Sequence, residues 1–162
     1  MKKPGFLIII AGPSGVGKGT VRKEIMKNKK LNLVFSISLT TREKRKGEVN
    51  GKDYYFVNEK KFKDAIKNGD LIEYNKYVGN YYGTSKSQVE KVRKMGKNIV
   101  LEIDVNGTRN ILKTFCKKDV ISFFIIPPNI KELEKRIRGR STESQSDIKN
   151  RLKKAKDEMK LK

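Results

Sequence analysis

The segment from Gly12 to Thr20 contains the residues whose types and spacing most clearly suggest chemistry. Four glycines and Lys18 follow an apolar run at residues 6–11, and a helical pattern over about 20–28 comes after them. A strand, a glycine-rich loop and a helix in this order form a phosphate-binding P-loop, in which backbone N–H groups and the helix N-terminus surround an anion. We therefore predict a nucleotide site in which Lys18 reaches the β- and γ-phosphates; the alternative is a glycine-rich turn with a surface lysine. The predicted phosphate-binding residues are Gly12, Pro13, Ser14, Gly15, Val16, Gly17, Lys18, Gly19 and Thr20.

The residue after the lysine departs from the usual P-loop pattern. A serine or threonine at that position normally supplies a hydroxyl ligand for Mg²⁺, but here the position is Gly19, and Thr20 lies one residue later. We therefore assign no certain protein ligand and expect phosphates and waters to hold the ion. The candidates for indirect contacts with Mg²⁺ are Thr20, Glu102 and Asp104.

A second group of polar side chains, between residues 38 and 82, suits a phosphate dianion. Arg42 and Arg45 are three residues apart and have hydroxyl groups around them, and guanidinium groups donate to phosphate in bidentate fashion. An exposed charged turn is the alternative interpretation of these two arginines. The group comprises Ser38, Thr40, Thr41, Arg42, Arg45, Tyr54, Tyr81 and Tyr82.

Two carboxylates are candidates for recognising a purine base. Glu73 lies in a short predicted strand, and Asp104 lies at the carboxyl end of a buried one. Guanine presents its N1–H and 2-amino groups as adjacent donors to such acceptors, whereas adenine lacks this pair and would leave a carboxylate unpaired. An ordinary acid at the edge of a strand is the alternative interpretation of Glu73.

Strands and helices alternate along the sequence, which predicts an α/β fold with ligands at the carboxyl ends of parallel strands. We expect Asn58, Thr84 or Ser85, and Asn129 to cap helices. Residues 38–84 form a predicted β-rich insert between core segments 1–37 and 85–162. The predicted strands are 6–11, 33–38, 54–57, 71–74, 77–82, 99–104 and 120–126, and the predicted helices are about 20–28, 58–68, 85–95, 108–115, 130–138 and 147–160.

The composition narrows the choice of partners and compartment. The net charge of +21 suits weak, salt-sensitive binding to polyanions and attraction of anionic nucleotides. Because most of the basic residues are lysines spread along the chain, we predict no dedicated nucleic-acid site. No apolar run is long enough to span a membrane, and the charged start leaves no room for a signal peptide. A single cysteine, Cys116, excludes an intramolecular disulfide and favours a cytoplasmic location.

The chain resembles the guanylate kinases in six motifs that occur in the order and spacing of that family. The motifs are Gly12–Thr20, Ser36–Arg42, Arg45–Tyr54, Gly79–Thr84, Leu101–Asp104 and Arg136–Arg140. Together they cover nearly the whole chain. The resemblance implies the reaction ATP + GMP ⇌ ADP + GDP with Mg²⁺, and also acceptance of dGMP. It further implies a P-loop NTPase core with a parallel sheet, a β-rich GMP-binding insert and a helical lid at about 138–147.

The same resemblance implies roles for individual residues. Lys18 would bridge the ATP phosphates and, with Arg42, form part of the catalytic set. The lid and its flanking helix would bring further arginines onto the transferring phosphoryl group; these are Arg136, Arg140 and Arg151. The GMP phosphate would contact Ser38, Arg42, Arg45, Tyr54 and Tyr82, and guanine would contact Glu73, Thr84 and Asp104.

The C-terminus departs from the family pattern more than the motifs do. Relatives continue into a last strand and helix near the adenine base, so we expect a missing tail in preference to a lost edge strand. Guanylate-kinase-like modules that bind phosphopeptides are a second function class, but they usually lose the P-loop lysine or glycines, which are intact here. A kinase acting on AMP fits Glu73 and Asp104 poorly. The chain is expected to be a monomer or a homodimer.

Overall fold

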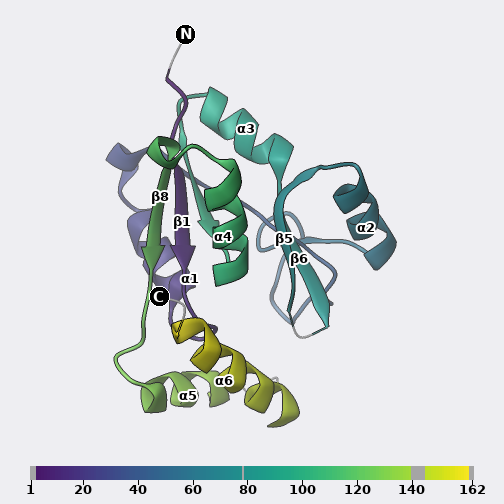
Figure 1. Cartoon of the computed structure of the whole chain (residues 1–162), viewed down its shortest axis with the longest axis vertical. Coiled ribbons are helices and arrows are strands. Elements are labelled where there is room, and N and C mark those ends of the chain that lie inside the picture. Colours follow the sequence, from purple (N-terminus) through teal and green to yellow (C-terminus); the bar gives the residue numbers. More distant parts are fainter. Residues whose placement is uncertain (1–2, 78, 140–144, 161–162) are drawn as a thin grey trace.

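The first of two sheets is fully parallel and contains the strand that leads into the glycine loop. A computed structural model describes residues 3–77, 79–139 and 145–160 (Figure 1). The strands lie in the order β2-β7-β1-β8. Leu7, Ile9 and Leu101 in this sheet are fully buried or nearly so. Two helices, α3 (Lys86–Lys94) and α4 (Val105–Thr114), cover one face of the sheet. The four strands are β1 (Leu7–Ala11), β2 (Leu33–Phe35), β7 (Asn98–Glu102) and β8 (Val120–Phe124).

The second sheet lies beside the first and is built from residues 39–85 (Figure 1). Its strand order is β4-β3-β6-β5, with β5 and β6 forming an antiparallel pair and β3 parallel to β4. Phe62 of α2 is fully buried and stacks on the ring of Tyr81 at 5.3 Å, which fixes this helix on the sheet. The elements are β3 (Leu39–Thr40), β4 (Tyr55–Phe56), α2 (Glu59–Lys67), β5 (Leu71–Tyr77) and β6 (Asn80–Ser85).

Side-chain caps set the start of four helices. Asn58, Ser85, Asp104 and Asn129 each accept a hydrogen bond from the backbone N–H three residues later, which satisfies a donor that the helix leaves open. The remaining helices are α1 (Lys18–Ile25), α3 (Lys86–Lys94), α4 (Val105–Thr114), α5 (Ile130–Arg138) and α6 (Gln145–Met159), with short 3₁₀ turns at Lys29–Leu31 and Lys117–Asp119.

A second apolar cluster joins α5 and α6 to the glycine loop. Leu133 and Ile137 of α5 pack with Val16, and Ile148 and Ala155 of α6 join them. Figure 1 shows both helices beneath the carboxyl ends of β1 and β8. The C-terminal helices therefore face the end of the sheet where ligands of parallel α/β folds bind.

The α/β fold with a parallel sheet is confirmed, but several predicted boundaries are wrong. Strand β7 ends at Glu102 and not at residue 104, because Asp104 caps α4, which starts three residues earlier than predicted. Strand β2 stops at Phe35 and β8 at Phe124, both short of the predicted ends. The two-residue strand β3 was not predicted. Half of the expected lid, residues 140–144 including Arg140, lies outside the described residues.

The outer edge of the parallel sheet is formed by β8. Within the part of the chain that the structure describes, β8 pairs only with β1. Ile121 and Phe123 on this strand are exposed, Phe123 to 56%. No helix among the described residues is long and apolar enough to cross a membrane.

Candidate active site

The glycine loop after β1 curls around a position at the N-terminus of α1. Gly12 and Gly15 have φ values of 143° and 85°, which favour glycine. Both are also packed against neighbours: a Cβ at Gly12 would lie 2.4 Å from the carbonyl oxygen of Ile125, and one at Gly15 would lie 2.7 Å from Cγ1 of Ile137. The loop is therefore shaped by the residue that follows β8 and by α5, as well as by its own sequence.

Lys18 folds back over this loop. Its Nζ donates hydrogen bonds to the carbonyl oxygens of Gly12 at 2.6 Å and Pro13 at 3.1 Å. Arg136 reaches the loop from α5, since its Nη1 donates to the carbonyl oxygen of Val16 at 3.1 Å and its Nε pairs with Glu132 at 2.9 Å. Two cationic groups thus stand at the helix N-terminus, where an anion is already favoured.

A cleft of about 550 Å³ opens between the glycine loop, the second sheet and α6. It brings together most of the residues predicted to bind nucleotides. The predicted residues lining it are Gly12, Ser14, Gly15, Gly17, Lys18, Gly19, Thr20, Ser38, Arg42, Arg45, Tyr54, Glu73, Tyr82, Glu102, Asp104 and Arg151. Pro13, Val16, Thr84 and Arg136 do not line the cleft, and Arg140 lies outside the described residues.

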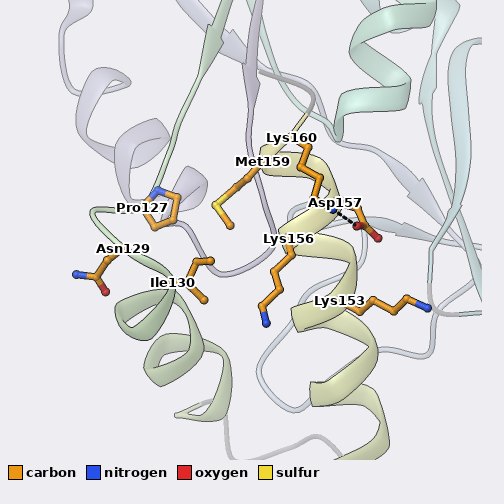
Figure 2. A pocket seen from close by; sticks show the side chains of 8 residues that line it. All are labelled: Pro127, Asn129, Ile130, Lys153, Lys156, Asp157, Met159 and Lys160. Atoms are coloured by element: carbon orange, nitrogen blue, oxygen red, sulfur yellow. Dashed lines mark ion pairs between the residues drawn. The ribbon is translucent and has the colours of Figure 1, made fainter.

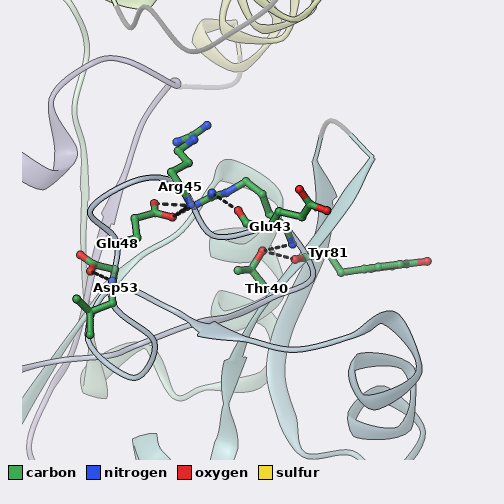
Figure 3. Close-up of polar contacts among 8 residues, drawn as sticks. Thr40, Glu43, Arg45, Glu48, Asp53 and Tyr81 are labelled. Atoms are coloured by element: carbon green, nitrogen blue, oxygen red, sulfur yellow. Dashed lines mark hydrogen bonds and ion pairs between the residues drawn. The ribbon is translucent and has the colours of Figure 1, made fainter.

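One wall of the cleft is an arginine-rich loop between β3 and β4 (Figure 3). Glu48 organises this loop: it pairs with Nη2 of Arg42 at 2.7 Å and accepts a hydrogen bond from the backbone N–H of Arg45 at 2.9 Å. Burial alone would raise the pKa of Glu48, but these hydrogen bonds bring it below its ordinary value. The Arg42 guanidinium also lies 5.5 Å from the ring centre of Tyr54. The guanidinium of Arg42 is therefore held in place before any ligand binds.

Glu73 of β5 is a buried residue of the same cleft. It is 7% exposed and accepts a hydrogen bond of 2.6 Å from the hydroxyl of Thr84, which is fully buried behind it. Burial, aided by the nearby charge of Asp104 and opposed by the Thr84 hydrogen bond, raises the pKa of Glu73 to about 7. Gly107 of α4 makes room for this carboxyl group, because a Cβ there would lie 2.5 Å from Oε2 of Glu73.

Asp104 has a different environment, with donors from three elements. Its Oδ1 caps α4 by accepting from the Gly107 N–H at 2.9 Å, and its Oδ2 accepts from the amide of Asn75 on β5. Nζ of Lys154 on α6 lies 3.5 Å from the same Oδ2. The two acids predicted to read guanine thus face one cleft, one of them buried with a hydroxyl donor and the other beside a cation.

The predicted contacts for Mg²⁺ also lie along the cleft. Glu102 faces Gly19 and is ion-paired with Arg22 at 2.6 Å. Among the described residues, no group of three or more acidic or cysteine side chains is arranged to hold a metal ion. Arg22 and Lys154 already lie beside the carboxylates of Glu102 and Asp104, respectively.

Sequence reasoning missed several residues of this site. Glu48 lies in the same loop as Arg42 and Arg45. Its negative charge, opposite to that of the two arginines, could have predicted an ion pair in this loop. Asn75, Lys154 and the buried Glu158 carry no motif that marks them. Burial raises the pKa of Glu158, and the neighbouring Lys154 opposes that shift.

A second hollow, of about 500 Å³, lies between α5 and α6 (Figure 2). It is lined by apolar groups and by lysines, and Figure 2 shows Lys153 extending from α6 away from Ile130 and Met159. None of the predicted nucleotide-binding residues lines it. The ion pair at its rim, between Lys160 and Asp157, measures 3.8 Å.

Comparison with known proteins gives the family. The sequence model described as "Guanylate kinase" matches residues 5–162. A guanylate kinase of Mesoplasma florum is 51% identical over 162 residues, which are 100% of this chain and 54% of that protein. A guanylate kinase of Lactobacillus acidophilus is 48% identical over 98% of this chain and 77% of its own length. This chain thus spans about half of one relative and three quarters of the other.

A solved structure agrees with both sequence relatives. The crystal structure of guanylate kinase from Anaplasma phagocytophilum superposes with a TM-score of 0.78 at 34% identity, covering 98% of this chain and 72% of that one. The predicted resemblance is confirmed over nearly the full chain. With its P-loop, its two-sheet fold and a cleft lined by arginines and two acids, the chain belongs to the guanylate kinase family.

Proposed function

We propose that the chain transfers the γ-phosphoryl group of ATP to GMP or dGMP by direct in-line displacement. The observation that carries this proposal is that one cleft contains both the P-loop lysine, Lys18, and the pair Glu73 and Asp104. ATP phosphates would lie at the N-terminus of α1, and GMP would lie against the second sheet. Residues 38–84 would form the GMP-binding insert.

The chemistry needs positioning and neutralisation of charge more than proton transfer. The attacking oxygen belongs to the GMP phosphate, which is already ionised at neutral pH, so no general base is required. Lys18 and Arg136 stand at the loop, and Arg151 enters the cleft from α6. These groups, with Arg140 from the expected lid, would stabilise charge on the transferring phosphoryl group.

The acceptor phosphate would lie at the other cationic wall of the cleft. Arg42, with Arg45 beside it, offers guanidinium donors suited to a dianion. Ser38, Tyr54 and Tyr82 line the same region. Because Glu48 already orients Arg42, little rearrangement of this arginine is needed on binding.

Base selection would follow from the two carboxylates. Guanine offers two adjacent N–H donors, so Glu73, positioned by Thr84, and Asp104 would both be paired in the complex. Adenine would instead place its N1 acceptor against a carboxylate and leave a buried charge without a donor, which is costly. Selectivity would therefore come from the penalty for the wrong base as much as from contacts with the right one.

Mg²⁺ would enter with ATP. The ion would neutralise phosphate charge, and phosphate oxygens and waters would supply most of its ligands. Thr20, Glu102 and Asp104 would contribute through water, since both acids already have cationic partners in the protein.

A coupled assay with ATP, Mg²⁺ and each nucleoside monophosphate in turn tests the proposal. GMP and dGMP should be phosphorylated, whereas AMP, CMP and UMP should give less than about a hundredth of the GMP rate, the discrimination expected for an unpaired buried polar group. Absence of GMP phosphorylation by the folded protein, or a preference for AMP, would overturn the assignment. We further expect a monomer or homodimer located in the cytoplasm, with weak polyanion binding only.

A further inference from the structure

Asp104 lies where three parts of the chain meet. Asn75 comes from the second sheet, Lys154 from the C-terminal helix, and Asp104 itself from the turn between β7 and α4. Asn75 donates to Oδ2 of Asp104, and Nζ of Lys154 lies 3.5 Å from that oxygen. Because Oδ1 is held by the N–H of Gly107, both carboxylate oxygens are fixed.

The lysine is itself held from two further sides. Nζ of Lys154 lies 4.1 Å from the ring centre of Tyr77 on β5 and 4.0 Å from a carboxylate oxygen of Glu158, which is 6% exposed. The side chain of Lys154 is 30% exposed and that of Asp104 is 21% exposed. A cation held among a ring and two acids has few alternative positions, so it fixes the direction in which Asp104 points.

From this arrangement we propose that Asn75 and Lys154 are positioning residues that set the choice of purine through Asp104. The inference rests on the proposed function. Asn75 and Lys154 hold the carboxylate plane so that its remaining lone pairs face the 2-amino group of guanine. Neither residue need contact the nucleotide. Loss of either side chain lets the Asp104 carboxylate rotate. The rotation weakens the binding of GMP more than the binding of IMP, because IMP lacks the 2-amino group.

The experiment measures kcat and KM with ATP plus either GMP or IMP. Asn75→Ala and Lys154→Met should each raise the KM for GMP about ten-fold, the order expected for one misaligned charge-assisted hydrogen bond. The KM for IMP and the KM for ATP should change less than about three-fold, which is no more than the loss of one weak surface contact would cause. Lys154→Arg retains a cation and should restore most of the selectivity.

A matched control separates position from charge. Lys153→Met removes the same charge from the neighbouring position of α6, and Lys153 is among the residues that line the other hollow. It should leave the ratio of the two KM values at the wild-type value. Thermal unfolding of each variant, measured without nucleotide, confirms that the variants are folded.

An Asp104→Asn background shows whether both residues act through Asp104. In that background Asn75→Ala and Lys154→Met should change GMP selectivity less than about two-fold, because coupled residues are not additive. Equal effects in both backgrounds, or unchanged selectivity in folded and active variants, would overturn this inference while leaving the proposed function standing. A wild-type protein without GMP kinase activity would instead reject the proposed function.

Discussion

Replacing Glu73 by glutamine should make the free protein more stable while weakening its use of GMP. Glu73 is buried with one hydroxyl donor, and its pKa is raised from 4.5 to about 7. Between these pH values the folded protein holds a proton that the unfolded chain has lost. The free energy of unfolding therefore falls as pH rises from about 4.5 to about 7, and it stays lower above that range.

The size of the effect follows from the two pKa values. Each pH unit between them costs about 1.4 kcal/mol, so ionising Glu73 costs about 3 kcal/mol in full. Glutamine keeps the acceptor for Thr84 and cannot ionise. We expect Glu73→Gln to gain less than about 1 kcal/mol over wild type at pH 5 and about 3 kcal/mol at pH 8.

Urea unfolding of the nucleotide-free protein at several pH values measures this difference. Glu90→Gln is the control, because it removes an exposed carboxyl group from α3 and should leave the free energy of unfolding close to the wild-type value. A stability gain of equal size at pH 5 and pH 8, or no gain at either, would show that Glu73 does not carry an ionisation cost. In the kinase assay, Glu73→Gln should raise the KM for GMP about ten- to hundred-fold, because a charged acceptor is lost.

Four other outcomes follow from the site. Because guanine requires ionised Glu73, the KM for GMP should fall about ten-fold from pH 6 to pH 8 in wild type and much less in Glu73→Gln; parallel profiles would assign the dependence to another group. Lys18→Ala should lower kcat about 10²-fold with an unchanged circular dichroism spectrum, and retention of about a tenth of the activity would contradict its role. Arg42→Ala should raise the KM for GMP about ten- to hundred-fold without altering ATP binding in calorimetry; equal weakening of ATP would remove it from the GMP site. Gly107→Ala forces a Cβ against Glu73 and should cost about 1–3 kcal/mol in urea unfolding, whereas a neutral effect would mean that the Glu73 side chain moves aside freely.

The core of the fold was predictable because its signals are local. An uninterrupted aliphatic run such as 6–11 identifies a strand buried on both faces. Asn58 and Asn129 mark helix N-termini, because each side chain accepts a hydrogen bond from a backbone N–H in the first turn. The boundary at Asp104 was wrong because the residue suits a strand end and a helix cap equally well, and only the hydrogen bond from Gly107 decides between them. Strand β3 has only two residues, too few to show the alternation of a strand in the sequence. It is defined by its pairing with Tyr82 and Gly83 of β6.

The site residues that belong to a sequence motif were predictable. The residues that strand pairing and helix packing bring to the site were not. The glycine loop and the two arginines have spacings that chemistry alone can interpret. Asn75 and Lys154 have none: one is an amide in a polar strand, and the other is one lysine among many. Both residues contact Asp104 because of the register of β5 against β6 and the position of α6 at the cleft. No local sequence pattern predicts either of these.

The strand β8 makes the association of copies of this protein sensitive to the ionic strength of the solution. Among the residues that the structure describes, β8 has a strand on one side only and carries the exposed Ile121 and Phe123, and an edge of this kind favours pairing with another copy of the chain. A net charge of +21 opposes that encounter over a screening length of about 10 Å at 0.1 M salt, which shrinks to about 3 Å at 1 M. The positive charge that we expect to attract anionic nucleotides would thus also keep copies of the chain apart. Concentrated salt screens both effects, so we expect salt that slows nucleotide capture also to favour association of copies through this edge.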